Sequence, residues 1–186
     1  MTHQQREVYP VDVAGVKRDL PLFEVAPGVR IAVLNILGDT ELVQAAAKAL
    51  SGKLQAANID VIVTAEAKSI PLAYALAVEM ACPWVILRKS YKPYMGKALQ
   101  AETLSITTGK PQVLYLDEKD TLLLKGKRVA LVDDVISTGS TLQSMHDLVT
   151  QAEGTIAAQA AVFTEGDLSQ WQDITSLGHL PVFTDE

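Results

Sequence analysis

Short runs of apolar residues alternate along the chain with segments in which apolar residues recur every three or four positions. The runs predict buried strands at Ile31–Leu34, Val61–Thr64, Trp84–Leu87, Val129–Val132 and Ile156–Phe163, with a short last one at Val182–Phe183. The periodic segments predict helices from Gly38–Thr40 to Gly52, from Pro71 to about Ala81, and from about Ser140 to Gln151. Strands that alternate with helices predict an α/β fold in a single domain, with a mostly parallel central sheet flanked by helices. Ligands of such sheets bind beyond the carboxyl ends of the strands.

The segment from Arg88 to about Gln100 breaks this alternation. It has no clear periodicity, it contains Pro93 and Gly96, and it is rich in cations and tyrosines. Loops of this length inside a domain are uncommon and are often functional, so we expect a flexible basic loop. A hairpin is predicted after it, from Thr103–Thr107 and Val113–Leu116 on either side of Gly109–Lys110–Pro111.

Composition narrows the cell compartment and the class of partner. The chain has 186 residues, 48% hydrophobic and 20% charged, which suits one globular domain with a sizeable core. A net charge of −6 argues against non-specific nucleic-acid binding, and the single cysteine, Cys82, fits a reducing compartment. Met1–Pro10 lacks the apolar core of a signal peptide, and no apolar run approaches the ~20 residues that span a bilayer. We therefore expect a cytoplasmic protein with neither nucleic-acid nor membrane partners.

The segment Val129–Thr141 carries the most specific chemistry. An apolar strand leads into two adjacent carboxylates, Asp133 and Asp134, followed by a hydroxyl-rich loop with one glycine and then a helix. Backbone N–H groups at a helix N-terminus bind anions, hydroxyls add donors, and Gly139 lets the backbone approach an oxyanion closely. Carboxylates beside such a cradle suit the hydroxyls of a sugar phosphate. The spacing matches neither a Walker A loop nor a dinucleotide-binding glycine motif.

This segment resembles the phosphoribosyl pyrophosphate signature of type I phosphoribosyltransferases. The resemblance implies that Asp133 and Asp134 bind the two ribose hydroxyls. It also implies that a continuous stretch wraps the 5-phosphate, namely Val135, Ile136, Ser137, Thr138, Gly139, Ser140 and Thr141.

A second stretch, Val61–Ala73, resembles the strand, loop and helix that bind pyrophosphate in the same family. Ala67, Lys68 and Ser69 are then the expected pyrophosphate-binding residues, with Lys68 supplying positive charge. Several relatives have glycine where this chain has Ser69.

The basic loop resembles the family loop that folds over the substrate. Its candidate substrate-binding cations are Arg88, Lys89, Lys92 and Lys97. With Asp133, Asp134 and Lys68, Arg88 completes the expected catalytic set. Alternative interpretations of the loop are a solvated basic surface or a subunit contact.

The resemblance covers roughly residues 33–166 and is strongest to the purine branch, through Glu66-Ala67 and Ile70-Pro71-Leu72-Ala73. It implies a hood formed by about residues 1–30, including Val16–Leu22, over the base pocket. Adenine enzymes commonly carry a glutamate two residues before the hairpin glycine, where this chain has Thr107.

The expected function is purine phosphoribosyl transfer, with adenine as first choice, followed by hypoxanthine or guanine, or xanthine. The resemblance implies Mg²⁺ bound mainly through phosphoribosyl pyrophosphate, and a homodimer. No protein metal site is expected, since His3, His146 and His179 share no ligand spacing. Two alternatives are a non-catalytic regulator that binds phosphoribosyl pyrophosphate or nucleotide, and a hydrolase that uses Asp133 as nucleophile.

Overall fold

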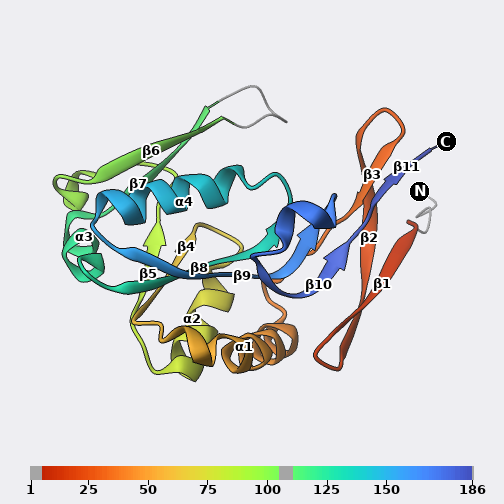
Figure 1. The fold of residues 1–186 in the computed structure, drawn as a ribbon. Helices are drawn as coiled ribbons and strands as arrows, with labels where there is room; N and C mark the ends of the chain where they lie inside the picture. The colour runs from red at the N-terminus through yellow and green to blue at the C-terminus, as the bar shows by residue number, and fades with distance from the viewer. Residues whose placement is uncertain (1–5, 105–110, 186) are drawn as a thin grey trace.

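A five-stranded, wholly parallel sheet forms the centre of the molecule in the computed structural model, which describes residues 6–104 and 111–185. Its order is β10 (Thr175–Leu180), β9 (Thr155–Glu165), β8 (Arg128–Ile136), β4 (Val61–Ala65) and β5 (Trp84–Leu87). Figure 1 shows α1 (Thr40–Leu54) and α2 (Ile70–Met80) below the sheet and α4 (Ser140–Gln151) above it. The predicted α/β class and the helix-flanked parallel sheet are confirmed.

Two hydrophobic layers explain this packing. Strand β4 is buried on both faces. Ile62 belongs to the hydrophobic layer between the sheet and helices α1 and α2, while Val61 and Val63 belong to the layer between the sheet and α4. A strand buried on both faces reads as a continuous apolar run, which is why β4 was predictable from the sequence. In β5, Val85 and Leu87 are buried while Trp84 and Ile86 are partly exposed, and four apolar residues in a row still predict a strand. None of the helices in the described ranges is long and apolar enough to cross a membrane.

A second, antiparallel sheet stands beside the core at the right of Figure 1. Its order is β1 (Val8–Val13), β2 (Val16–Ala26), β3 (Val29–Ala32) and β11 (Val182–Thr184). The N-terminal segment expected to form the hood therefore lies in a sheet, called the hood sheet below, that β11 near the C-terminal end of the chain completes. Sequence reasoning did not indicate this pairing.

One prediction for this region is wrong. Ile31–Leu34 was expected to be a strand of the core, but Ile31 lies in β3 and pairs with Phe23 and Val182 in the hood sheet. A run of four apolar residues fits either sheet equally well, since the run does not specify its partner strands.

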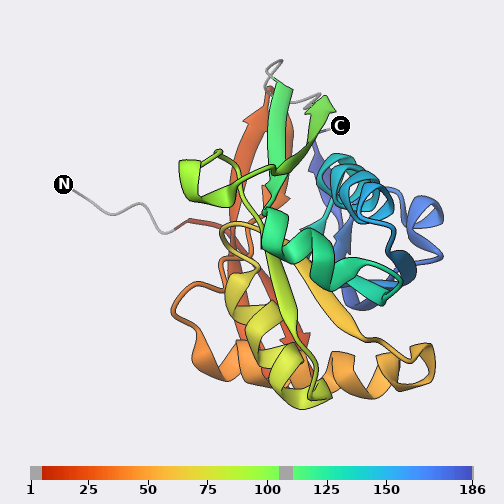
Figure 2. The ribbon, with the colours of Figure 1, turned by 90° about the vertical axis from the view of Figure 1, so that its left-hand side faces the viewer.

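A hairpin is present, formed by β6 (Leu99–Leu104) and β7 (Pro111–Leu116), but its first strand begins at Leu99 rather than at the predicted Thr103, within the segment predicted to be loop. Figure 2 shows it beside the short helix α3 (Glu118–Leu124), which the sequence pattern had not indicated. The turn of the hairpin, including Thr107 and Gly109, lies outside the described residues.

Candidate functional site

The carboxylate pair lies within β8 rather than after it. The strand continues to Ile136, and Asp133 pairs with Ala161 of β9 in the parallel register. Pairing with β9 on one side keeps the backbone extended through the two acids, so the predicted end at Val132 was four residues short. Because side chains alternate along a strand, the two carboxylates leave the sheet on opposite faces.

Asp133 is held by two donors. The Ser69 hydroxyl donates to Asp133 Oδ1 at 2.5 Å, and the Asp134 backbone N–H donates to the same oxygen at 2.9 Å. Burial, followed by the neighbouring Asp134 charge, raises the pKa of Asp133 to about 7, while the hydrogen bond from Ser69 lowers it. Near neutral pH, Asp133 is therefore poised between its neutral and ionised forms.

Asp134 is only 6% exposed, and its Oδ2 lies 3.1 Å from the Lys68 ammonium nitrogen. The contact is an ion pair without hydrogen-bond geometry, and within the described ranges Oδ2 accepts no hydrogen bond. Lys68 Nζ also donates to the Leu34 carbonyl at 3.2 Å. A buried carboxylate oxygen with an unused lone pair is a ready acceptor for a ligand hydroxyl.

A short loop joins β8 to α4 and is the expected phosphate cradle. Gly139 adopts a positive φ of 74° directly before the first helical residue, Ser140. The Thr138 and Ser140 hydroxyls lie 3.1 Å apart and hydrogen bond to each other. The loop encloses a small hollow lined by Asp133 and by residues 135–142. The hollow faces the start of a 12-residue helix, where N–H groups and the helix dipole favour an anion.

The loop between β4 and α2 approaches this cradle from the neighbouring strand. It contains a cis peptide bond between Glu66 and Ala67, followed by Lys68 and Ser69. Ser69 is buried, and both it and Lys68 contact the carboxylate pair. The structure thus brings the predicted pyrophosphate-loop residues Lys68 and Ser69 to the predicted ribose-binding acids.

Glu66 joins the same loop to the end of β5, a role that sequence reasoning missed. Its carboxylate accepts from Arg88 Nε at 2.7 Å and from the Lys89 backbone N–H at 2.5 Å. The backbone of Arg88 also pairs with Tyr115 of the hairpin. Arg88 is therefore fixed by Glu66, beside the pyrophosphate loop. A signal was present in the sequence, because Glu66 directly precedes the predicted anion-binding residues. An unpaired carboxylate there would repel the anion, so a cationic partner for Glu66 could have been expected.

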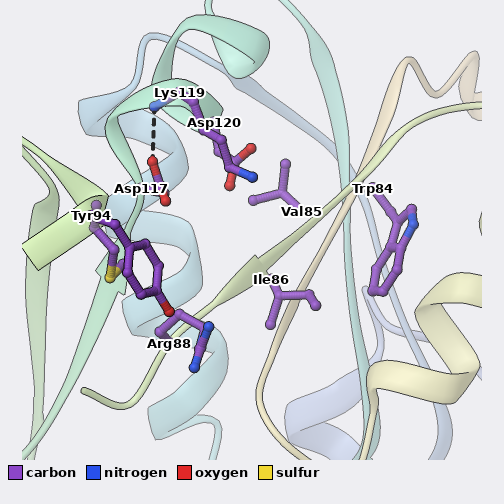
Figure 3. A pocket seen from close by; sticks show the side chains of 9 residues that line it. Trp84, Val85, Ile86, Arg88, Tyr94, Asp117, Lys119 and Asp120 are labelled. Atoms are coloured by element: carbon purple, nitrogen blue, oxygen red, sulfur yellow. Dashed lines mark hydrogen bonds between the residues drawn. The ribbon is translucent and has the colours of Figure 1, made fainter. Parts of the chain in front are cut away.

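Figure 3 shows a cavity of about 350 Å³ along β5 that shares only Arg88 with the predicted site. In this view Tyr94 points its hydroxyl toward Arg88, while Trp84 lies on the other side of Ile86. The cavity runs along β5, the edge strand of the sheet, and its lining includes no residue of β8, so we do not assign it to the site.

Within the described ranges, none of the four loop cations forms a hydrogen bond or ion pair with Asp133 or Asp134. Lys92 and Lys97 make their contacts elsewhere. The backbone of Lys97 donates to Glu118 Oε2 at 2.9 Å, and that of Lys92 donates to the Met95 sulfur at 3.3 Å. Both lysines are exposed, and their side chains form no ion pair with any other described residue.

The hood borders a cavity of about 320 Å³, lined in part by Arg18–Pro21 of β2 and by Val33–Asn35. The expected hood segment, Val16–Leu22, thus faces an open space. The Leu34 carbonyl that holds Lys68 belongs to the same wall, so this cavity adjoins the pyrophosphate loop. Arg18 fixes the hood to α1 through a bidentate pair with Asp39, at 2.8 and 2.9 Å.

Comparisons with known proteins agree with this geometry. The xanthine phosphoribosyltransferase of Chloroflexus aurantiacus is 34% identical over 139 residues, which are 73% of this chain and 65% of that protein. The hypoxanthine/guanine phosphoribosyltransferase of Methanococcus voltae is 36% identical over 110 residues, 59% of this chain and 55% of that protein. The purine biosynthesis transcriptional repressor PurR of Bacillus subtilis is 28% identical over 133 residues, which are 72% of this chain and 46% of that protein. The chain thus spans about half to two thirds of the length of these relatives.

Solved structures show the same fold. Adenine phosphoribosyltransferase from Saccharomyces cerevisiae superimposes with a TM-score of 0.67 at 20% identity, over 92% of this chain and 94% of that one. The adenine phosphoribosyltransferase from Thermoanaerobacter pseudethanolicus superimposes with a TM-score of 0.66, also at 20% identity, over 93% of this chain and 95% of that one. The phosphoribosyl transferase domain model matches residues 33–173, which include the carboxylate pair and both anion-binding loops. The predicted family is confirmed: this chain belongs to the phosphoribosyltransferases, and its relatives include purine enzymes.

Proposed function

We propose that this protein transfers the 5-phosphoribosyl group from phosphoribosyl pyrophosphate to a purine base, releasing pyrophosphate. The carrying observation is that Asp133 and Asp134 lie between two anion-binding loops at the carboxyl edge of one parallel sheet. Adenine is the first choice of base, followed by hypoxanthine or guanine, or xanthine. The relatives named for xanthine and for hypoxanthine/guanine support the purine class.

The geometry assigns a part to each side of the substrate. The carboxylates of Asp133 and Asp134 accept hydrogen bonds from the ribose hydroxyls. The N–H and hydroxyl groups of Val135–Thr141 hold the 5-phosphate, which fixes the sugar relative to the base. The anomeric carbon develops oxocarbenium character as its bond to pyrophosphate breaks, and the adjacent carboxylates stabilise that positive charge.

The leaving pyrophosphate gathers negative charge, which the other loop offsets. Lys68 lies beside Asp134 and is exposed enough to reach a ligand. Arg88 and Lys89, held at the end of β5 by Glu66, add charge on the same side. Ala67, Ser69 and Lys92 complete the proposed contacts. Closure of the basic loop excludes water, which would otherwise capture the reactive sugar.

We propose that Mg²⁺ enters with the substrate. No cluster of three or more potential ligands occurs in the part of the chain that the structure describes, but two carboxylates adjoin the proposed phosphate sites. Mg²⁺ characteristically keeps several waters and binds through substrate phosphates with few carboxylates, so this donor set fits it. Asp133 and Asp134 are the groups that would hold its waters, and the ion would supply positive charge against the departing pyrophosphate.

We propose further that the protein acts as a cytoplasmic homodimer. Tyr74 and Val78 on α2 are 55% and 62% exposed, and the Tyr74 ring packs edge-on against Trp84 of β5. Exposed apolar side chains that lie together on one helix face are candidates for a subunit contact. Light scattering of the purified protein, with Tyr74→Lys as the variant expected to dissociate it, tests this.

A second candidate function is that of a regulator that binds phosphoribosyl pyrophosphate or nucleotide without catalysis. The match to PurR over 72% of this chain favours it specifically. The chain retains both acids and Lys68, and the Lys68 ammonium group lies against Asp134, which favours catalysis.

One experiment separates the two functions. The protein is incubated with phosphoribosyl pyrophosphate, Mg²⁺ and, separately, adenine, hypoxanthine, guanine and xanthine, and nucleotide formation is followed by chromatography. Conversion of one base, abolished in Asp134→Asn, supports the transferase and names its substrate. Binding of phosphoribosyl pyrophosphate by calorimetry without conversion of any base supports the regulator instead.

A further inference from the structure

The phosphate loop is covered from outside by an aromatic side chain that belongs to neither anion-binding motif. Trp171 ends the short 3₁₀ turn Leu168–Trp171 after β9. A Cβ atom built on Gly139 would lie 3.2 and 3.3 Å from Cη2 and Cζ3 of the Trp171 ring. The edge of the indole therefore touches the backbone of the cradle at the residue where the loop becomes helix α4.

Trp171 is itself held in place. Its indole N–H donates to the Glu165 carbonyl at 2.9 Å, at the end of β9. The ring packs against the hydrophobic layer that lies under α4. The 3₁₀ turn is fixed by Asp167, whose carboxylate accepts from the Ser169 backbone N–H at 2.9 Å. The indole is thus fixed to the sheet rather than carried by the loop that it touches.

Two independent features of this contact disfavour any residue other than glycine at position 139. Its φ of 74° is unfavourable for residues with a Cβ, and the indole occupies the space that a side chain would need. A glycine has many accessible conformations, so an unsupported Gly139 would leave the neighbouring N–H groups poorly aligned for an anion. A fixed ring against it removes part of that freedom before the ligand arrives.

We propose that Trp171 is a positioning residue for the phosphate loop, and that it sets the affinity for the 5-phosphate of the sugar substrate. This inference rests on the proposed function, since it takes the cradle to be the 5-phosphate site. Trp171 does not contact the base or the pyrophosphate in this role. Its loss should therefore weaken the binding of phosphoribosyl compounds and leave recognition of the base unchanged.

The chain has two tryptophans, so fluorescence can isolate the one of interest. In Trp84→Phe, all tryptophan emission comes from Trp171, and titration with ribose 5-phosphate should change it saturably. Calorimetry on the same variant should give the wild-type dissociation constant, because Trp84 lies outside the proposed site. In Trp171→Leu, the dissociation constant for ribose 5-phosphate and the KM for phosphoribosyl pyrophosphate should both rise about tenfold. The reason is that the phosphate loop loses the ring that holds it in its binding conformation, so that binding must order the loop. The KM for the base should stay unchanged.

A double-mutant cycle distinguishes loss of the contact between Trp171 and Gly139 from a general loss of structure. Gly139→Ala should weaken ribose 5-phosphate binding strongly beside Trp171 and less strongly in Trp171→Leu, where the ring no longer blocks the added methyl group. If Trp171→Leu does not fold by circular dichroism, Trp171→Phe replaces it and should show the same split between the two KM values to a smaller degree.

Each outcome bears on the inference. A folded Trp171 variant that binds ribose 5-phosphate as tightly as wild type, or one in which both KM values rise together, overturns it while the proposed function stands. A wild-type protein that binds neither ribose 5-phosphate nor phosphoribosyl pyrophosphate overturns both.

Discussion

Ser69 provides the sharpest test of how the carboxylate pair is tuned. Its hydroxyl donates to Asp133 Oδ1 at 2.5 Å from a side chain that is buried against β8. Ser69→Ala removes that donor and leaves Asp133 Oδ1 with only the Asp134 N–H. The hydrogen bond favours the ionised carboxylate, so its loss raises a pKa that burial has already raised to about 7.

The size of the effect follows from the strength of such a bond. A hydrogen bond to a charged group contributes about 1.5–3 kcal/mol, and a difference of about 1.4 kcal/mol between the two protonation states moves a pKa by about one unit. If binding of the ribose requires ionised Asp133, a shift of about one unit lowers activity about fivefold at pH 7 and hardly at all at pH 9. The acidic limb of the pH profile shifts to higher pH by about one unit.

The assay is kcat/KM for phosphoribosyl pyrophosphate between pH 5.5 and 9.5, in wild type and in Ser69→Ala. Ser51→Ala is the matched control, because its hydroxyl donates only to the Lys48 carbonyl on the surface of α1. A Ser69→Ala profile that falls equally at all pH values, or whose acidic limb coincides with that of wild type, would refute the reasoning.

Three further perturbations follow from the same contacts. Because the folded-state pKa of Asp133 lies above its ordinary value, folded protein binds the proton more tightly and loses stability as pH rises toward about 7. Asp133→Asn should therefore abolish activity yet raise Tm at pH 8, with the gain vanishing near pH 4 in calorimetric scans. Glu66→Gln should release Arg88 and raise the KM for phosphoribosyl pyrophosphate about tenfold, as for loss of a charged hydrogen bond, with the KM for the base unchanged. Arg18→Ala breaks the bidentate pair with Asp39, so limited proteolysis should cut the hood faster and the KM for the base should rise.

The parts of the site predictable from sequence are those built from consecutive residues. Strand β8, the acid pair, the hydroxyl loop and α4 lie in one stretch, and each element there obeys a local rule of periodicity or of helix starts. Trp84–Leu87 was predicted to the residue, and the helix predicted from about Ser140 to Gln151 has those bounds in the structure. Local rules suffice because each element carries a regular apolar pattern: β5 is four apolar residues in a row, and α4 is strongly amphipathic.

The parts that the sequence did not reveal depend on contacts between distant residues. Glu66 acquires its role only when β5 lies beside β4 and presents Arg88. The hood needs β11, whose Phe183 pairs with Arg30 across most of the chain length. Trp171 follows Gly139 by 32 positions, and nothing in a turn of mixed polarity predicts that its ring reaches the loop.

Lys68 shows how these distant contacts make one site. Its ammonium group lies between the buried carboxylate of Asp134 and the Leu34 carbonyl, and Leu34 lines the cavity under the hood. One cation thus touches both the proposed ribose site and the wall of the proposed base pocket before any ligand binds. A pyrophosphate group that competes for Lys68 would take the donor from the Leu34 carbonyl and the cation from Asp134 Oδ2, which already accepts no hydrogen bond within the described ranges and is open to a ribose hydroxyl. We therefore expect binding of the anion and preparation of the sugar site to be linked through this single side chain.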